Sequence, residues 1–457
     1  MHMNSSNQHI IIIGGNAAGM SAASRIRRND PKVKITVFEK SNHVSYAACG
    51  LPYFISDEIN RPDNLIAVQI DDFVEQRNIQ VKLRHEGISF DSRSKTVEVK
   101  DLENDRMVEL EYDKLIIATG ARPVMPSITG SHLKNIFVLR TLDQGIRLKE
   151  HIENTHPKNA LIIGGGYIGM EMVEALVKKN INVTLVEMRD RLMNNVDREI
   201  SDQIENYLKD KGCNIIISEK VIAFVGDEKV QAVRFQRNKE MDVDLVLIAS
   251  GIQPNVEMAV SGGVELGKSG AIAVSSKMQT NKMHVFAAGD CAEAKNIVTG
   301  KNDYVPLGTT ANKQGRVAGD NASGKVSHFK GIVATAAVKI FDLEVARTGI
   351  TEQQATDLRI PFKKVIIKDK TRASYYPGSE PITVLLIFNV TNGKLLGAQI
   401  LGFQGAAKRI DILATALHNS MTVQEIAELD LSYAPPFAPV WDPILIAANQ
   451  AVKKIRQ

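Results

Sequence analysis

The sequence predicts an α/β protein in which one βαβ unit occurs twice and a C-terminal α+β layer follows. Residues 9–40 and 159–190 share one plan: an apolar β-branched run, a glycine turn, a helical segment and a second apolar run ending in an acidic residue. Residues 382–430 instead indicate paired strands followed by a helical pattern. A chain of 457 residues with 44% hydrophobic content is also too long for one core, so about two to four domains are expected.

The second unit has a complete glycine signature. Gly164, Gly166 and Gly169 form G-x-G-x-x-G, and Glu187 follows at the end of the next apolar run. Such glycines permit a tight turn and a close approach of the backbone to a pyrophosphate, which lies at the positive end of the following helix. A single signature of this kind is weak evidence, because glycine turns also occur for packing alone.

The first unit departs from this signature at one position. Gly14 and Gly19 are present, Asn16 replaces the middle glycine, and Glu39 ends the second apolar run. Two such units, each opening a helix after a strand and each with an acid placed for a ribose diol, are far more specific than one. We therefore predict two dinucleotide sites.

The acid of the second unit bears on the choice of nicotinamide cofactor. Glu187 would accept a bond from the free 2′-hydroxyl of NADH and would repel the 2′-phosphate of NADPH. Arg189, two residues later, would partly offset that repulsion. NADH is therefore the favoured cofactor, and NADPH stays an alternative.

Composition excludes several classes of protein. The formal net charge is +4 with no long run of one sign, so nucleic acid is not an implied partner. No apolar run approaches a membrane span, and no export signal is seen, so we expect a cytoplasmic protein. Cys49, Cys213 and Cys291 lie far apart without C-x-x-C, which argues against a disulfide framework or a thiolate metal site, and we expect no metal.

Three further segments end in glycine turns: "YDKLIIATGARP" (112–123), "VDLVLIASGIQPN" (243–255) and "TNKMHVFAAGDCAE" (280–293). In this order, around the repeat, they make the chain resemble the pyridine nucleotide-disulfide oxidoreductases. The resemblance implies an FAD-binding Rossmann-like domain over 1–120 and 251–327, an NAD(P)H-binding Rossmann-like domain over 121–250, and an α+β dimerisation domain over 328–457, hence a homodimer.

The same resemblance assigns cofactor residues. For FAD they are Gly14, Gly19, Glu39, Lys40, Thr119, Gly120, Gly289 and Asp290. For NAD(P)H they are Gly164, Gly166, Tyr167, Gly169, Glu187 and Gly251. Tyr167 is expected to cover the flavin until NADH displaces it.

The stretch "SYAACGLPY" (45–53) contains a cysteine that is either a redox centre or a buried small hydrophobe. Two-cysteine members of the family have a second cysteine where this chain has Phe54. The resemblance therefore narrows to the single-cysteine branch of NADH oxidases, NADH peroxidases, coenzyme A-disulfide reductases and persulfide or polysulfide reductases. The oxidases and peroxidases have a histidine where this chain has Ala17, which disfavours peroxide or oxygen chemistry.

Basic residues on the first helix point to the coenzyme A reductases. Arg25 and Arg28 lie three apart on one helix face, and guanidinium groups suit phosphate, although a solvated basic face is the alternative. The resemblance implies that coenzyme A, as part of the substrate, is bound by Ser21, Arg25, Arg28, Ser45 and Asn312.

The C-terminal third has the second branch signal. "RASYYPGSEP" (372–381) and "LSYAPPFAPVWDP" (431–443) resemble the two tyrosine segments of coenzyme A-disulfide reductases. There, the tyrosines matching Tyr375 and Tyr433 reach the cysteine of the partner subunit. Ordinary interface aromatics are the alternative. Between these segments, 382–402 predicts a hairpin with Asn392-Gly393 as its turn, and 406–430 an amphipathic helix.

The sequence thus predicts an FAD-dependent, NAD(P)H-driven reductase of coenzyme A disulfide, or of a related persulfide or polysulfide. Cys49 would be the redox centre, with its thiol pKa lowered by a helix that Gly50-Leu51-Pro52 opens. Tyr375 and Tyr433 would protonate the departing thiolate. Cys213 and Cys291 are expected to pack. An NADH oxidase or peroxidase and a non-catalytic flavin redox sensor stay as alternatives.

Overall fold

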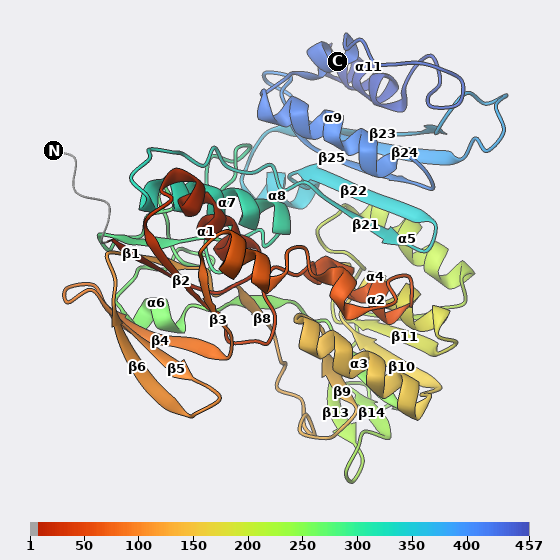
Figure 1. The fold of residues 1–457 in the computed structure, drawn as a ribbon. Helices are drawn as coiled ribbons and strands as arrows, with labels where there is room; N and C mark the ends of the chain where they lie inside the picture. The colour runs from red at the N-terminus through yellow and green to blue at the C-terminus, as the bar shows by residue number, and fades with distance from the viewer. Residues whose placement is uncertain (1–7, 457) are drawn as a thin grey trace.

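The computed structural model describes residues 8–456 and has three sheet-based units (Figure 1). The first unit contains a parallel five-stranded sheet in the order β18-β7-β1-β2-β3. Its strands are β1 (His9–Ile13), β2 (Lys34–Phe38), β3 (Gln80–Lys82), β7 (Lys114–Ile117) and β18 (Val285–Ala287). Strand β18 joins this sheet after the chain has passed through the second unit, so the first unit is discontinuous in sequence.

Two helices of the first unit pack unusually closely against each other, α1 (Ala17–Asn29) and α7 (Gly308–Ala322). A side chain at Gly315 would overlap the carbonyl oxygen of Ala18, and one at Gly319 would come within 2.7 Å of the carbonyl oxygen of Ala22. Small residues on both helices thus allow the backbones to touch. This contact places the middle of α7 beside the start of α1.

A three-stranded antiparallel sheet extends from the first unit (Figure 1). It consists of β4 (His85–Asp91), β5 (Thr96–Asp101) and β6 (Arg106–Glu111). Short elements complete the unit: η3 (Pro62–Leu65), the π-helical η4 (Asp72–Gln76), α6 (Glu257–Ser261), β19 (Ala294–Lys295) and β20 (Asn302–Asp303).

The second unit repeats the parallel design, with strand order β12-β11-β10-β16-β9. The strands are β9 (Ile136–Val138), β10 (Asn159–Ile163), β11 (Asn182–Glu187), β12 (Asn214–Ile217) and β16 (Leu245–Ile248), and the helices are α3 (Leu142–Thr155), α4 (Tyr167–Lys178) and α5 (Arg198–Asp210). A small antiparallel sheet adds β13 (Val221–Val225), β14 (Ala232–Phe235) and β15 (Glu240–Asp242). The chain enters and leaves along one antiparallel pair, β8 (Ala121–Pro123) and β17 (Ile252–Pro254).

The C-terminal unit is an antiparallel sheet covered by helices, as Figure 1 shows. Its strand order is β21-β22-β25-β24-β23, with β21 (Ala336–Ile340), β22 (Leu343–Gly349), β23 (Phe362–Lys370), β24 (Pro381–Asn389) and β25 (Leu395–Gly402). The helices are α8 (Glu352–Asp357), α9 (Ala406–His418), α10 (Val423–Ala427) and α11 (Pro443–Arg456). The predicted fold class, two Rossmann-like units followed by an α+β unit, is confirmed.

Two details of this unit differ from the prediction. The hairpin of β24 and β25 is present, but its connection spans 390–394 rather than Asn392-Gly393 alone, and only Gly393 takes positive φ (71°) there. The single helix expected over 406–430 is wrong, because the chain breaks into α9 and α10. Ser420 has φ 54°, and the hydroxyl of Thr422 accepts a bond from the Glu425 N–H to start a new helix.

No helix within residues 8–456 is long and apolar enough to cross a membrane.

Candidate functional site

The first glycine turn admits no side chain at two positions. Gly14 has φ 110°, and a Cβ there would overlap the carbonyl oxygen of Ala118. A Cβ on Gly19 would overlap the carbonyl oxygen of Gly14. Asn16 precedes helix α1 without capping it, so its side chain leaves the first N–H groups of α1 open toward the turn. An uncapped helix start behind close-packed glycines is the geometry that binds a pyrophosphate.

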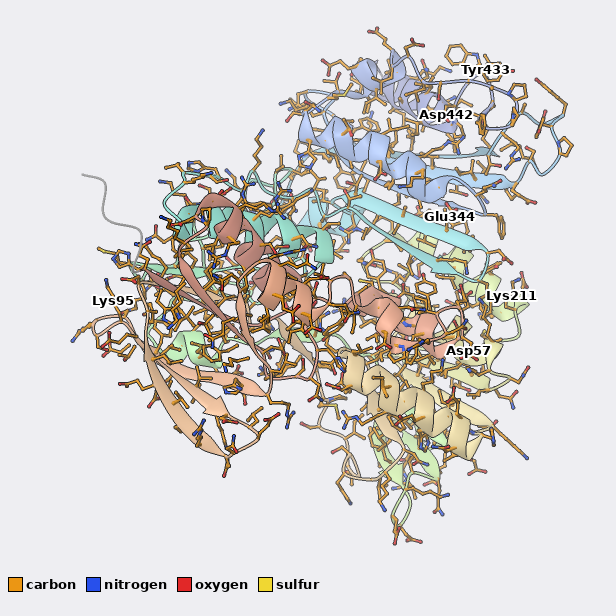
Figure 2. The ribbon with its side chains drawn as sticks, in the orientation of Figure 1. Asp57, Lys95, Lys211, Glu344, Tyr433 and Asp442 are labelled. Carbon is orange, nitrogen blue, oxygen red and sulfur yellow. The ribbon has the colours of Figure 1, made fainter. Side chains whose placement is uncertain are left out.

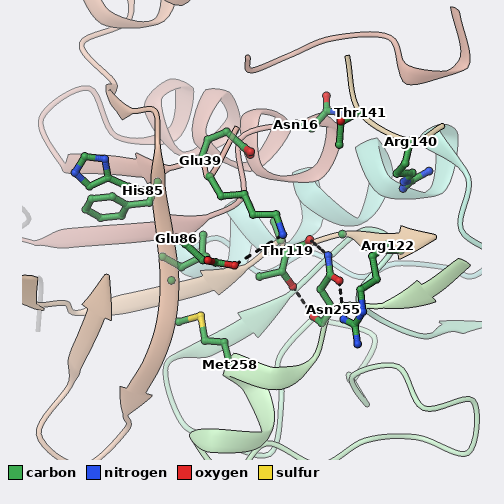
Figure 3. A pocket seen from close by; sticks show the side chains of 18 of the residues that line it. Asn16, Glu39, His85, Glu86, Thr119, Arg122, Arg140, Thr141, Asn255 and Met258 are labelled. Carbon is green, nitrogen blue, oxygen red and sulfur yellow. Dashed lines mark hydrogen bonds and ion pairs between the residues drawn. The ribbon is translucent and has the colours of Figure 1, made fainter. Parts of the chain in front are cut away.

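Glu39 stands at the end of β2 beside this turn. Its carboxylate accepts one hydrogen bond from the Gly15 N–H (2.7 Å) and another from the Ser41 N–H (2.8 Å). The next residue, Lys40, is exposed and lies 3.8 Å from a carboxylate oxygen of Glu86. Glu39 and Glu86 face the same hollow in Figure 3, and Lys40 also lines it.

That hollow is a cavity of about 690 Å³, which is within the usual range of small-molecule sites. Apolar walls come from Phe38, Ile88 and Met258, and polar groups from Asn16, Glu39, Lys40, Thr119, Arg122, Arg140, Thr141 and Asn255 (Figure 3). The size, the open helix start and the acid at the ribose position together fit an adenine dinucleotide such as FAD.

The floor of the cavity is fixed where the chain crosses to the second unit. Thr119 Oγ1 donates to the carbonyl oxygen of Asn255 (2.7 Å), and the Asn255 amide donates back to the Thr119 carbonyl (2.8 Å). Arg122 also donates to the Asn255 side chain (2.9 Å). Gly120 lines the cavity with φ 67°. Both predicted residues, Thr119 and Gly120, therefore lie at the cavity.

Gly289 and Asp290 follow β18 and lie under helices α1 and α7. The Gly289 N–H donates to Gln314 Oε1 (2.8 Å). Asp290 pairs with Arg140, and its carbonyl oxygen accepts from the Tyr304 hydroxyl (2.8 Å). Burial, and then the Asp290 charge, raises the pKa of Tyr304. Sequence reasoning missed Arg140 and Tyr304, because they come from separate segments with no motif around them.

The second glycine turn repeats the first closely. Gly164 has φ 113°, and a Cβ there would overlap the carbonyl oxygen of Ala249. A Cβ on Gly169 would overlap the carbonyl oxygen of Gly164, whereas Gly166, the N-cap of α4, has open space. Gly251 follows β16 with φ 110°, and a Cβ there would meet open space among the residues that the structure describes.

Glu187 and Tyr167 complete the surroundings of this turn. The Glu187 carboxylate accepts from the Gly165 N–H (2.8 Å) and the Arg189 N–H (2.8 Å), and it is only 8% exposed. Tyr167 is the first residue of α4, and its buried hydroxyl has no hydrogen-bond partner within the described part of the chain. The turn, the open helix start and this unpaired hydroxyl fit a second dinucleotide.

Cys49 lies in a short 3-10 turn, η2 (Ala48–Gly50), directly before helix α2 (Leu51–Ile55). The predicted helix start is confirmed, with Pro52 in the first turn. Ala48 lines the cavity, and Cys49 is exposed, whereas the other two cysteines are buried. Cys291 donates to backbone oxygens of Ile117 and Ala288, so the packing interpretation of the buried cysteines is confirmed.

The electrostatics around Cys49 differ from the expectation. Partial burial, and then the charge of Glu171, raises the pKa of the Cys49 thiol, while Arg140 acts to lower it. The expected lowering is therefore wrong for the single chain: a helix of five residues is a weak dipole, and a carboxylate stands near it. Burial beside Glu174 raises the pKa of Glu171 itself to about 7.

The predicted substrate residues fall into two groups. Ser21 Oγ donates to Asn312 Oδ1 (2.6 Å), joining α1 to α7. Arg25 is already paired with Asp320 (2.6 Å), while Arg28 is exposed and has no ion pair among residues 8–456. Ser45 is half-buried with φ 53°, and its N–H donates to the Gly15 carbonyl (2.9 Å). Ser21, Arg25, Arg28 and Asn312 therefore lie on the α1–α7 side of the first unit. Ser45 lies at the glycine turn.

The two predicted tyrosines lie together on the C-terminal unit. Their hydroxyl oxygens are 3.4 Å apart, and Tyr375 is 74% exposed. The bond to Tyr375 raises the pKa of Tyr433. Phe437 and Trp441 are exposed on the same connection as Tyr433. Figure 2 places Tyr433 at the outer side of this unit, away from Asp57, which follows helix α2.

Two dinucleotide-type turns, with an exposed cysteine beside the first, define a class of redox proteins that use two dinucleotides. The chain belongs to the pyridine nucleotide-disulphide oxidoreductase family: the family model matches residues 8–315, and the model of the family's dimerisation domain matches residues 335–443. Membership implies a flavin and a pyridine nucleotide as cofactors.

Relatives with established names cover nearly the whole chain. An NAD(P)H coenzyme A polysulfide/persulfide reductase of Pyrococcus horikoshii is 39% identical, over 96% of this chain and 97% of its own. An NADH oxidase of Methanocaldococcus jannaschii is 36% identical (97% and 99%), and a coenzyme A disulfide reductase of Staphylococcus haemolyticus is 31% identical (94% and 96%). Among solved structures, the reduced CoADR-RHD of Bacillus anthracis matches with a TM-score of 0.96 at 35% identity, covering 98% of this chain and 81% of that one.

Proposed function

We propose that this protein uses NADH, with NADPH as a second donor, to reduce coenzyme A disulfide or a related coenzyme A persulfide or polysulfide. The observation that carries the proposal is the position of Cys49: the cysteine is exposed, next to a cavity residue, and at the start of a helix. The names of the relatives support the substrate class.

The proposed binding face for coenzyme A is the α1–α7 side of the first unit. Ser21 and Asn312 offer a hydroxyl and an amide there, and the exposed Arg28 offers a guanidinium that has no ion pair among residues 8–456. Arg25 would have to share its guanidinium between a phosphate and Asp320, because the ion pair is already formed. We therefore expect Arg28 to contribute more to phosphate affinity than Arg25.

In the proposed reaction, Cys49 attacks one sulfur of the disulfide as a thiolate. The substrate S–S bond breaks, the first thiol leaves with a proton, and the second half stays bonded to Cys49 as a mixed disulfide. Two electrons from NADH then release the second thiol, so one NADH and one proton yield two thiols and NAD⁺. A bound FAD would supply the electron transfer between nicotinamide and sulfur.

We assign proton delivery to the tyrosine pair of a second copy in a homodimer. The Tyr433 hydroxyl is protonated at neutral pH, so that it can donate to a departing thiolate. Large exposed side chains beside it, Tyr375, Phe437 and Trp441, suit an interface between two copies. The match to the dimerisation domain supports this assignment.

Oxygen is a second candidate electron acceptor, favoured by the NADH oxidase relative. At the first glycine turn this chain has Ala17 and no imidazole, so a group to protonate reduced oxygen is lacking at that position. We therefore rank oxygen below the disulfide substrates.

The test is anaerobic NADH consumption with coenzyme A disulfide, with the released thiols counted. The wild type should release two thiols per NADH. Cys49→Ser should lose at least about a hundredfold in kcat, because no nucleophile remains. Cys213→Ala alters a buried cysteine that does not line the cavity and should keep the wild-type kcat. Sulfide release from a coenzyme A persulfide without disulfide turnover would select the persulfide substrate, and oxygen consumption alone would select the oxidase.

A further inference from the structure

Helix α2, which follows Cys49, is held at its carboxyl end by a lysine of the second unit. Lys149 belongs to α3, which follows strand β9 of the second sheet, and it is 8% exposed. Its Nζ donates to the carbonyl oxygen of Phe54 (2.9 Å), pairs with Asp57 Oδ1 (2.7 Å), and lies 4.3 Å from the ring centroid of Phe54. The buried ammonium of Lys149 thus has three partners in helix α2 or just after it.

This lysine meets the last turn of the helix, where its bond to the Phe54 carbonyl oxygen is shorter than the bond that the Asp57 N–H makes to the same oxygen (3.4 Å). The last carbonyls of a helix lack intrahelical partners, so a side-chain donor there is stabilising. Phe54 is the residue before the last of α2. Asp57 then takes a left-handed conformation (φ 66°) that turns its carboxylate back toward Lys149. Hydrogen bonds from Lys149 and Lys179 lower the pKa of Asp57, so this carboxylate stays charged at neutral pH.

Further contacts fasten the same segment to the second unit. Lys179, at the end of α4, pairs with the other oxygen of Asp57, and Lys178 pairs with Glu58 (2.6 Å). Figure 2 shows Asp57 where α2 lies against this unit. At the opposite end of α2, Gly145 packs so closely that a Cβ there would lie 2.7 Å from Leu51 Cδ2.

Gly145 and Lys149 are four residues apart, on one face of α3. That face therefore fits both ends of α2, with a glycine at the start of the helix and a buried cation at its end. Cys49 lies two residues before Leu51. The position of the thiol is thus set by helix α3 of the second unit and by the sheet of the first unit, from which the cysteine segment extends.

We propose that Lys149 is a positioning residue that braces α2 and so fixes the Cys49 thiol next to Ala48, which lines the cavity, tying the cysteine to the unit that would bind the nicotinamide nucleotide. Lys149 does not line the cavity, and it acts through Phe54 and Asp57. The inference rests on the proposed function only for the turnover measurement.

The experiment compares Lys149→Met with Lys149→Arg in the flavin-containing protein. Lys211→Met is the matched control, because Lys211 also pairs with an aspartate, Asp342 (3.2 Å), and lies 5.3 Å from the ring centroid of Tyr207, but contacts the C-terminal unit instead of α2. Three quantities are measured: kcat, the KM for NADH, and the pH midpoint of Cys49 alkylation by iodoacetamide. The other cysteines are buried, so the alkylation reports on Cys49.

Loosening α2 should hydrate the thiol and so reduce the burial that raises its pKa. For Lys149→Met we expect an alkylation midpoint lowered by at least about half a pH unit, a kcat lowered about tenfold and an unchanged KM for NADH. Lys149→Arg should recover most of both changes, and Lys211→Met should show neither.

A midpoint that stays in place or rises in Lys149→Met overturns the proposal, even if the variant melts at a lower temperature. If Lys149→Met does not fold, Asp57→Asn, at a half-exposed site, is judged by the same midpoint criterion. If the wild type fails to reduce any coenzyme A disulfide or persulfide, the proposed function fails, and the alkylation midpoints still decide the role of Lys149.

Discussion

The two glycine turns form nearly the same structure around different chemistry. In each, a glycine with φ near 110° lies against a backbone carbonyl, a second glycine lies against the first, and an acid accepts two backbone N–H groups. These features are set by sterics and by unpaired backbone donors, so they recur wherever the turn recurs.

The differences between the units lie one helical turn further on. Ser21 in α1 corresponds to Glu171 in α4, 150 residues later. Ser21 bonds to Asn312, whereas Glu171 is one of the charges that influence Cys49. Glu39 lines the large cavity, whereas Glu187 is buried beneath its turn. The two nucleotide sites therefore share the geometry of the glycine turn. They differ in the residues that follow the glycines, and these residues distinguish the functions of the two sites.

The largest expected effect breaks the feature that the turns share. Gly14→Ala and Gly164→Ala should each destabilise the protein by more than the roughly 1–3 kcal/mol of backbone strain alone, because the new Cβ also overlaps a carbonyl oxygen. Denaturant unfolding measures the loss. Gly120→Ala is the control: it has φ 67° with open space around the Cβ, so it should show only the strain. Equal losses of unfolding free energy in all three variants would contradict a contribution from the contact between the Cβ and the carbonyl oxygen.

The next prediction separates the two sites. Glu39→Gln and Glu187→Gln each replace a charged acceptor of two N–H bonds by an amide that accepts through one oxygen, at a cost of about 1.5–3 kcal/mol. Glu39→Gln should lower the flavin content of the purified protein and leave the KM for NADH of the loaded fraction. Glu187→Gln should raise that KM about tenfold or more with the flavin retained. If both variants changed the same quantity, the assignment of the two turns would be wrong.

The third prediction concerns Glu171, where the units diverge. A carboxyl whose pKa is raised to about 7 in the folded state binds more protons than the unfolded chain between its ordinary pKa of 4.5 and 7. Its contribution to the free energy of unfolding therefore becomes less favourable as pH rises through that window. Relative to wild type, Glu171→Gln should gain roughly 3 kcal/mol between pH 4.5 and pH 8.

Urea unfolding at both pH values measures this gain, and the same variant should show a lower alkylation midpoint for Cys49, since a charge that raises its pKa is gone. Ser21→Ala, at the corresponding position of α1, is the control and should show no pH-dependent difference. A Glu171→Gln profile parallel to that of wild type would contradict the raised pKa.

Sequence alone predicted what local spacing determines. The repeat predicted both turns and both acids, and Gly50-Leu51-Pro52 predicted the helix start after Cys49, which is present. The thiol environment was not predictable, because Arg140, Glu171 and Asp290 reach Cys49 from three distant segments. The break after His418 was missed because the helical spacing of apolar residues continues across it, although Thr422 and Glu425 have the spacing of a capping box.

The smallest expected effect concerns the one residue at which the two glycine signatures differ. Asn16 Oδ1 accepts from the Tyr46 N–H (3.2 Å), linking the turn to the segment before Cys49. Asn16→Gly would restore the consensus but remove that bond, at a cost of about 1 kcal/mol in the free energy of unfolding. At the second turn, Gly166→Asn meets open space and should change stability by less than that. If Asn16→Gly left the free energy of unfolding unchanged, the bond to Tyr46 would not explain why this turn departs from the consensus. If it also altered the alkylation rate of Cys49, the asparagine would be the link by which the first nucleotide turn positions the cysteine segment.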